Sequence, residues 1–125
     1  MRAMIVDDSR AMRTILRRLL ADCGYTEIGE AANGREGLDM LNAGYVPELL
    51  LVDWNMPEMS GIELVSAVRE HPEWSELILV MITTETSIDR IEEALSRGAD
   101  EYVMKPFTKD VLLEKLEIIK AARTS

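Results

Sequence analysis

Four short apolar runs in this chain each stop abruptly at a polar residue. Runs this short and this apolar are typical of strands buried on both faces of a parallel sheet. Because the carboxyl ends of parallel strands lie at one edge of the sheet, the residues after them would converge there. The runs and the residues after them are 4–6 with Asp7 and Asp8, 49–52 with Asp53, 77–82 with Thr83, and 102–104 with Lys105.

Helical patterns separate these runs. Ser9 can cap a helix whose apolar residues recur at helical spacing until Gly24 ends it. Ser60 and Thr108 can cap two more helices, and two others fill the remaining gaps. A weakly patterned strand is expected over residues 27–32. Five strands alternating with five helices imply an α/β fold, with a doubly wound parallel sheet covered by helices on both faces.

Length and composition narrow the class of protein. A chain of 125 residues is long enough for one core, and we expect a single domain over 1–125. The net charge of −9 argues against direct binding of nucleic acid. No apolar run approaches the ~20 residues of a membrane span, and the N-terminus does not resemble a signal peptide. Cys23 is the only cysteine, which excludes an internal disulfide and fits a cytoplasmic location.

The residues at the strand ends suit one kind of chemistry. Asp7, Asp8 and Asp53 would repel one another unless a cation lay between them. Carboxylates at a site open to water favour a hard ion such as Mg²⁺. A carboxylate can also act as a nucleophile and form an aspartyl phosphate, while Lys105 and Thr83 could bind the transferring oxygens. The set therefore predicts Mg²⁺-dependent phosphoryl transfer.

Taken singly, each of these residues has a plainer explanation. An Asp-Asp pair is more often a turn or a helix cap. A threonine at a strand end is usually a strand residue or an N-cap, and a Lys-Pro pair is usually surface. The prediction depends on their coincidence at the ends of four separate apolar runs.

Two motifs extend this interpretation to a family. Residues 53–57 read Asp-Trp-Asn-Met-Pro, and residues 102–107 read Tyr-Val-Met-Lys-Pro-Phe. In this order they resemble the receiver domain of two-component response regulators, most of all the single-domain chemotaxis regulators of the CheY type. The resemblance covers residues 2–122. It implies a flavodoxin-like, CheY-like sheet of five strands in the order 2-1-3-4-5 with five helices, in which the first and third strands are neighbours.

The resemblance also assigns a metal centre. It implies that Asp53 is the phosphoacceptor and takes its phosphoryl group from a sensor histidine kinase, of the CheA type in chemotaxis. Asp8 and Asp53 would bind Mg²⁺ directly, Asp7 through water, and Asn55 through its backbone carbonyl. The protein would be a signalling switch and not an enzyme, although it would catalyse its own phosphorylation and dephosphorylation.

Three further residues would respond to the phosphoryl group. Lys105 would contact it, and its peptide bond to Pro106 would be cis. Thr83 would be drawn towards the phosphoryl oxygens, and Tyr102 would rotate into the space that Thr83 leaves. The surface of the fourth helix, fifth strand and fifth helix would change with them. Plain packing of Tyr102 against the last helix is the alternative.

Two positions beside the site bear on the reaction. In the family, the residues at Asn55 and Glu85 influence how quickly water removes the phosphoryl group, and both match the chemotaxis type. We therefore expect a short-lived phosphoryl state. A Mg²⁺-dependent phosphohydrolase of the haloacid dehalogenase type is the alternative enzyme, but it requires an acidic residue two positions after its nucleophile. Asn55 occupies that position and cannot act as an acid.

The partners beyond the kinase are less defined. Chemotaxis regulators that bind the flagellar motor switch carry two adjacent lysines where this chain has Ser87 and Ile88, although Lys115 matches. The motor switch is therefore a candidate output partner that this substitution places in question. We expect a monomer. Since the chain starts at Met1 and stops soon after the last helix, we expect a stand-alone regulator, with a receiver excised from a larger regulator as the alternative.

Overall fold

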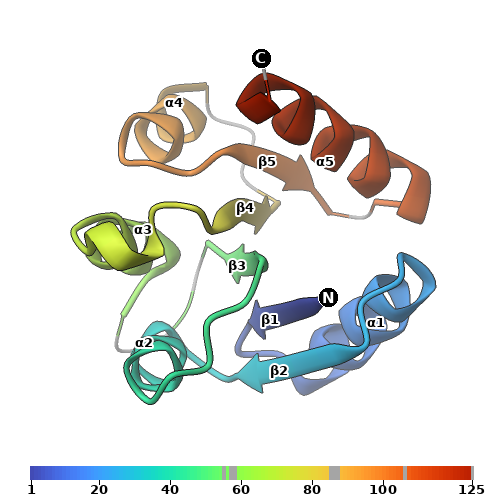
Figure 1. Ribbon diagram of the computed structural model, residues 1–125, viewed down its shortest axis with the longest axis horizontal. Helices are drawn as coiled ribbons and strands as arrows, with labels where there is room; N and C mark the ends of the chain where they lie inside the picture. Colours follow the sequence, from blue (N-terminus) through green and yellow to red (C-terminus); the bar gives the residue numbers. More distant parts are fainter. Residues whose placement is uncertain (55, 57–58, 85–87, 106, 125) are drawn as a thin grey trace.

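A parallel sheet between two layers of helices makes up the molecule (Figure 1). The computed structural model describes residues 1–54, 56, 59–84, 88–105 and 107–124. The strands are β1 (Arg2–Val6), β2 (Glu27–Ala31), β3 (Leu49–Asp53), β4 (Ile78–Thr83) and β5 (Glu101–Met104). The helices are α1 (Arg10–Asp22), α2 (Gly34–Asn42), α3 (Gly61–Arg69), α4 (Ile88–Ser96) and α5 (Lys109–Thr124), with a short 3-10 helix η1 (Pro72–Trp74).

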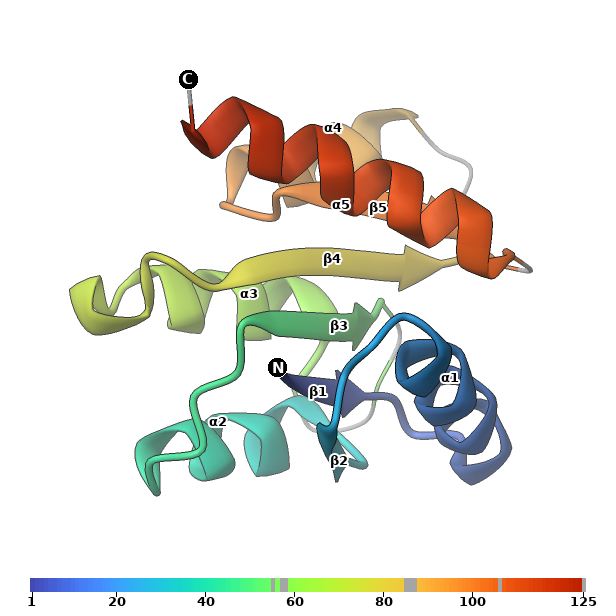
Figure 2. The same cartoon turned by 45° about the vertical axis from the view of Figure 1, so that its right-hand side comes forward.

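The strand order is β2-β1-β3-β4-β5, and every pair is parallel. Figure 2 shows β1, β3 and β4 running in the same direction. In register, Val6 lies beside Val52, and Asp53 lies beside Ile82. The doubly wound α/β fold and the order implied by the resemblance are both confirmed. Because β1 and β3 are neighbours, the residues at their carboxyl ends meet at one edge.

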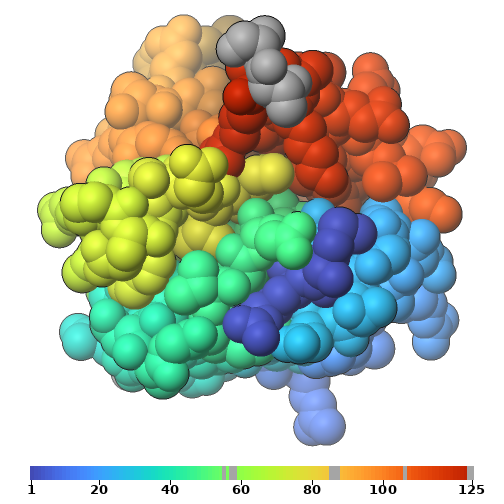
Figure 3. Space-filling view, in the orientation of Figure 1, coloured from blue at the N-terminus to red at the C-terminus, as the bar shows by residue number. Residues whose placement is uncertain are grey.

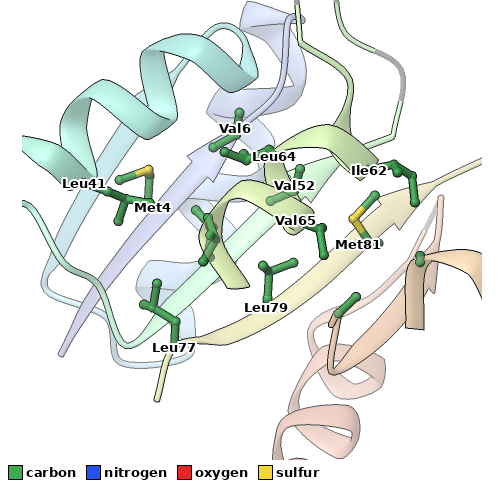
Figure 4. Packing of buried hydrophobic residues seen from close by; sticks show 14 of the residues in the cluster. Met4, Val6, Leu41, Val52, Ile62, Leu64, Val65, Leu77, Leu79 and Met81 are labelled. Carbon is green, nitrogen blue, oxygen red and sulfur yellow. The ribbon is translucent and has the colours of Figure 1, made fainter. Parts of the chain in front are cut away.

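Each face of the sheet carries its own apolar core. Alternate residues of β3 point to opposite faces, so Val52 packs under α2, α3 and α4 while Leu51 packs under α1 and α5. Figure 4 shows Val65 of α3 close to Val52 and Met81. Every residue of β3 and β4 is buried, which explains why these runs are apolar throughout. Each large side chain buried in this way contributes about 1.5–3 kcal/mol.

Local sequence signals place the helices. The Ser9 hydroxyl accepts a hydrogen bond from the Met12 N–H at 3.2 Å and caps α1, as expected. Ser60 and Glu63 form a capping box at the start of α3. Gly24 follows α1 with a φ of +98°, a conformation that favours glycine. β1 begins two residues before the expected run, and the other strand boundaries differ by at most one residue, because hydrogen bonding to the neighbouring strand sets them.

The Asp100 carboxylate joins several elements at the edge of the sheet formed by the amino ends of the strands, opposite the predicted site. Asp100 accepts hydrogen bonds from the Leu79 N–H at 2.8 Å, from Arg69 at 2.9 Å and from Arg123 at 3.1 Å. Arg69 belongs to α3 and Arg123 to the end of α5. Gly98, with a φ of +120°, packs so closely on the Arg69 side chain that a larger residue would collide with it. No spacing in the sequence predicts this network.

The termini lie near this same end of the molecule. In Figure 3 the first residues (dark blue) lie in the middle of the visible face, between the green and light blue parts of the chain. Met1 is half exposed, and its carbonyl accepts hydrogen bonds from the backbone N–H groups of Thr26 and Glu27. The carboxyl ends of the strands, where the site is predicted, therefore lie away from both chain termini.

We predict that Asp100→Ala lowers the free energy of unfolding by about 2 kcal/mol, because it removes the acceptor of the Leu79 N–H and the carboxylate partner of two guanidinium groups. Urea unfolding followed by circular dichroism measures the change. Asp39→Ala, on the exposed face of α2, serves as the control and should change stability by less than about 0.5 kcal/mol. Equal stability of the two variants would contradict the prediction.

Candidate functional site

The ends of β1, β3, β4 and β5 bring the predicted polar residues to one edge of the sheet. One carboxylate oxygen each from Asp7, Asp8 and Asp53 lies within 4.8 Å of the other two. Lys105 follows β5, and its Nζ lies 3.2 Å from Asp53 Oδ1 and 3.3 Å from Asp7 Oδ2. The structure thus brings together the carboxylates and the ammonium group whose convergence the sequence predicted.

The three carboxylates differ in their exposure to water. Asp7 is 1% exposed and Asp53 is 8% exposed, or 11% over its side chain. Asp8 is exposed, so the cluster opens to solvent on its side. Among the described residues, Lys105 pairs with Asp7 and Asp53, and its single positive charge cannot balance the three carboxylates. Oxygen donors with an open side suit a hard divalent cation such as Mg²⁺, and these residues fit such an ion.

The environment of Asp53 disfavours its ionised form. Burial and the nearby Asp7 carboxylate raise the pKa of Asp53 above its ordinary value. Lys105 lowers it, but not enough to offset the two larger effects. The ionised form of Asp53 is therefore under electrostatic strain that a bound cation would relieve.

Backbone contacts of the following residue, Trp54, hold Asp53 at the carboxyl end of β3. The Trp54 N–H donates to the Ile82 carbonyl at 3.2 Å, and the Trp54 carbonyl accepts from the Gly61 N–H at 3.0 Å. A side chain at Gly61 would collide with the Asp53 carbonyl oxygen. This glycine therefore permits the close approach of α3 to the strand end.

Thr83 and Tyr102 lie on the same face of the sheet, on neighbouring strands. Met81 is beside Tyr102 in register and Thr83 is beside Met104, so these side chains share the face covered by α3 and α4. Thr83 is 1% exposed. Tyr102 is half-buried, and Lys115 Nζ lies 5.2 Å from its ring centroid. This placement is compatible with both the switch and the packing interpretation of Tyr102.

Some predicted residues fall outside the described part of the chain. They are Asn55, Glu85, Ser87 and Pro106. The carbonyl ligand expected at Asn55 and the cis peptide bond expected before Pro106 therefore stay predictions.

Sequence reasoning missed two features beside the site. Arg13 donates a hydrogen bond to the Asp7 carbonyl, a contact between α1 and a strand end that no sequence spacing reveals. An apolar cavity of about 380 Å³ lies between α1 and Phe107, with Thr84 and Lys105 on its wall. Ile15 of α1 lines this cavity and is 58% exposed.

Several proteins resemble this chain in sequence. The family model for the response regulator receiver domain matches residues 3–117. Chemotaxis protein CheY1 of Helicobacter pylori is 42% identical over 119 residues, which cover 95% of this chain and 96% of the relative. Chemotaxis protein CheY of Pseudomonas aeruginosa is 45% identical over 119 residues, 95% of each chain.

Solved structures of receiver domains resemble this fold. The chemotaxis response regulator CheY4 of Vibrio cholerae has a TM-score of 0.83 at 36% identity, covering 94% of this chain and 97% of that one. A signal receiver domain of a histidine kinase from Syntrophus aciditrophicus has a TM-score of 0.84 at 26% identity, covering 97% of this chain and 90% of that one.

The chain therefore belongs to the response regulator receiver domain family. It is homologous to chemotaxis response regulators, which are phosphorylation-activated signalling proteins and not conventional enzymes. None of the helices that the structure describes combines the length and the apolar character needed to cross a bilayer.

The raised pKa of Asp53 predicts a specific dependence of stability on pH. The folded protein holds the Asp53 proton more tightly than the unfolded chain does, so ionising this residue costs stability above its raised pKa. Below the pKa of an ordinary aspartate the cost is absent. We expect Asp53→Asn to unfold at a higher urea concentration than the wild type near neutral pH without divalent cations. This advantage should shrink as the pH falls from the raised pKa of Asp53 in the folded protein to the pKa of an ordinary aspartate.

The exposed Asp39 provides the control, since Asp39→Asn should leave the urea midpoint nearly unchanged across the same pH range. An Asp53→Asn variant that is no more stable than the wild type near neutral pH would contradict the prediction.

Proposed function

We propose that this receiver domain accepts a phosphoryl group on Asp53 from a sensor histidine kinase, with Mg²⁺, as a single-domain regulator of the chemotaxis type spanning residues 1–125. The observation that carries the proposal is the position of the Asp53 carboxylate between Lys105 and two further aspartates at the sheet edge. The similarity to CheY proteins over nearly their whole length supports it. We place the protein in the cytoplasm, as a monomer that binds neither nucleic acid nor membrane.

The chemistry follows from the charges at the site. An Asp53 oxygen attacks the phosphorus of a phosphohistidine, the bond from phosphorus to the imidazole nitrogen breaks, and an acyl phosphate forms. Lys105 already contacts Asp53, so its ammonium group is placed to hold a phosphoryl oxygen. Mg²⁺ held by Asp7, Asp8 and Asp53, with the Asn55 carbonyl, would neutralise charge as the nucleophile approaches.

Several features support a switch that reads the phosphoryl group. Thr83 lies at the end of β4 next to the site, and Tyr102 shares its face of the sheet. We infer that Thr83 moves towards the phosphoryl group and that Tyr102 follows, which changes the surface of α4, β5 and α5. Within the described residues, this surface carries several exposed apolar side chains: Ile88, Leu95, Met104, Val111 and Ile118.

The apolar surface bears on the choice of partner. Ile88 is 70% exposed at the start of α4, where regulators that bind the flagellar motor carry a lysine. A CheA-like kinase is the upstream partner we propose. The motor switch remains one candidate for the output partner, and this chain would meet it with an apolar side chain at that position. A pulldown with and without phosphorylation identifies the partner.

Lys115, the residue of this surface that matches motor-binding regulators, is already engaged within the domain. It lies over the Tyr102 ring and pairs with Glu101 at 3.5 Å. Ile88 is the most exposed large apolar side chain of those described. Phosphorylation depends on residues at the carboxyl ends of the strands, whereas the choice of partner depends on the surface of α4, β5 and α5. The two are therefore separate questions.

We predict that acetyl phosphate with Mg²⁺ adds one phosphoryl group to the protein. Intact-mass spectrometry should show a single adduct, which should be absent in Asp53→Asn and when EDTA removes the metal. Asp39→Asn, which changes a carboxylate far from the strand ends, should be phosphorylated like the wild type. An adduct that persists in Asp53→Asn would exclude Asp53 as the acceptor.

We also predict a short lifetime for the phosphoryl group, because the residues at Asn55 and Glu85 match those of chemotaxis regulators. After the phosphodonor is removed by rapid gel filtration, the adduct should disappear within minutes in the presence of Mg²⁺. A phosphoprotein that lasted for hours would show that other residues control hydrolysis.

A further inference from the structure

Arg13 of α1 contacts the backbone of Asp7, one of the three clustered aspartates. Its Nη1 donates to the carbonyl oxygen of Asp7 at 2.7 Å. This carbonyl belongs to the peptide unit between Asp7 and Asp8, which is planar, so its direction also fixes the direction of the Asp8 N–H and the position of the Asp8 Cα. The Arg13 side chain is 15% exposed, and the contact is thus largely shielded from water.

Glu30 of β2 holds Arg13 in this position. Arg13 Nε lies 3.1 Å from one Glu30 oxygen, and Arg17 Nε lies 2.6 Å from the other. Burial would raise the pKa of Glu30, but hydrogen bonds and charge from Arg17 and Arg13 lower it overall, so Glu30 is ionised near neutral pH. The guanidinium fork of Arg13 is therefore fixed at both ends, by a carboxylate on one side and the Asp7 carbonyl on the other.

The two aspartates depend on this backbone to different degrees. The Asp7 carboxylate has its own contacts, since it accepts the Ser9 N–H at 2.8 Å and the Lys105 ammonium group at 3.3 Å. The Asp7 N–H also donates to the Ala31 carbonyl. Asp8 is exposed to solvent, so its position relies on the peptide unit that precedes it. Orientation of that peptide unit matters most for Asp8.

We propose that Arg13 is a positioning residue for the metal centre: by orienting the Asp7–Asp8 peptide unit, it holds the Asp8 carboxylate where the cluster can bind Mg²⁺. This inference rests on the proposed function of the site. Arg13 also carries a positive charge, which by itself opposes the binding of a cation. Loss of orientation weakens Mg²⁺ binding and loss of charge strengthens it, so the sign of the effect separates the two roles.

Arg17 provides a matched control. It lies one helical turn after Arg13 and pairs with the same Glu30, and its Nη2 donates to the Ile28 carbonyl and not to the Asp7–Asp8 peptide unit. In Arg13→Met, Glu30 keeps Arg17 as its partner; in Arg17→Met, it keeps Arg13. Each variant therefore removes one guanidinium group and leaves the carboxylate paired.

The test is a titration of wild type, Arg13→Met and Arg17→Met with Mg²⁺ alone, followed by amide chemical shifts in two-dimensional NMR spectra. These spectra also report whether each variant is folded. We expect the Mg²⁺ dissociation constant of Arg13→Met to rise roughly tenfold, the lower end of the effect of removing a group that orients a metal ligand. Arg17→Met should bind like the wild type. Saturating Mg²⁺ should restore the rate of phosphorylation of Arg13→Met by acetyl phosphate.

Each other outcome overturns the inference. Unchanged or tighter binding in Arg13→Met would show that its charge matters and its orienting contact does not. Equal weakening in Arg17→Met would assign the effect to general support of α1 on β2. If Arg13→Met does not fold, Arg13→Lys, which keeps the charge but cannot span Asp7 and Glu30 together, should also bind more weakly, and wild-type affinity in it would overturn the proposal. A wild type that binds no Mg²⁺ would instead overturn the proposed function itself.

Discussion

Repulsion among Asp7, Asp8 and Asp53 is the constraint on which the rest of this structure depends. The parallel sheet brings their oxygens within 4.8 Å of one another. Two unit charges at about 4 Å repel by about 4 kcal/mol at an effective dielectric constant near 20. Lys105 offsets part of this energy, while burial and the Asp7 carboxylate raise the pKa of Asp53 above its ordinary value. The apolar cores on both faces of the sheet must stabilise the fold against it.

The two edges of the sheet handle charge in opposite ways. At one edge, Asp100 receives hydrogen bonds from Arg69, Arg123 and a backbone N–H, so its charge is matched and the elements around it are fixed together. At the other edge, the Lys105 ammonium group pairs with Asp7 and Asp53, two of the three clustered carboxylates. An unmatched cluster responds strongly when a cation or a phosphoryl group changes its charge. The network at the far edge joins α5 to α3 through Asp100.

The sequence by itself determined the architecture and most of the site. Short apolar runs that end on Asp7, Asp53, Thr83 and Lys105 and alternate with helices are typical of parallel strands, and parallel strands place the residues at their carboxyl ends along one edge. Capping residues and glycines set the helices for the same local reason. These signals lie within a few residues of the elements they specify, which is why they could be read in advance.

Only the tertiary structure decided the contacts between distant side chains. The hydrogen bond from Arg13 to the Asp7 carbonyl, the joining of α3 to α5 through Asp100, and the exposure of Ile15 beside Phe107 depend on how helices pack across the sheet. Such packing is set by the shapes and charges of many residues at once, and no spacing in the sequence encodes it. The sequence thus identified the groups that converge at the sheet edge, while the fold decided how firmly each of them is held.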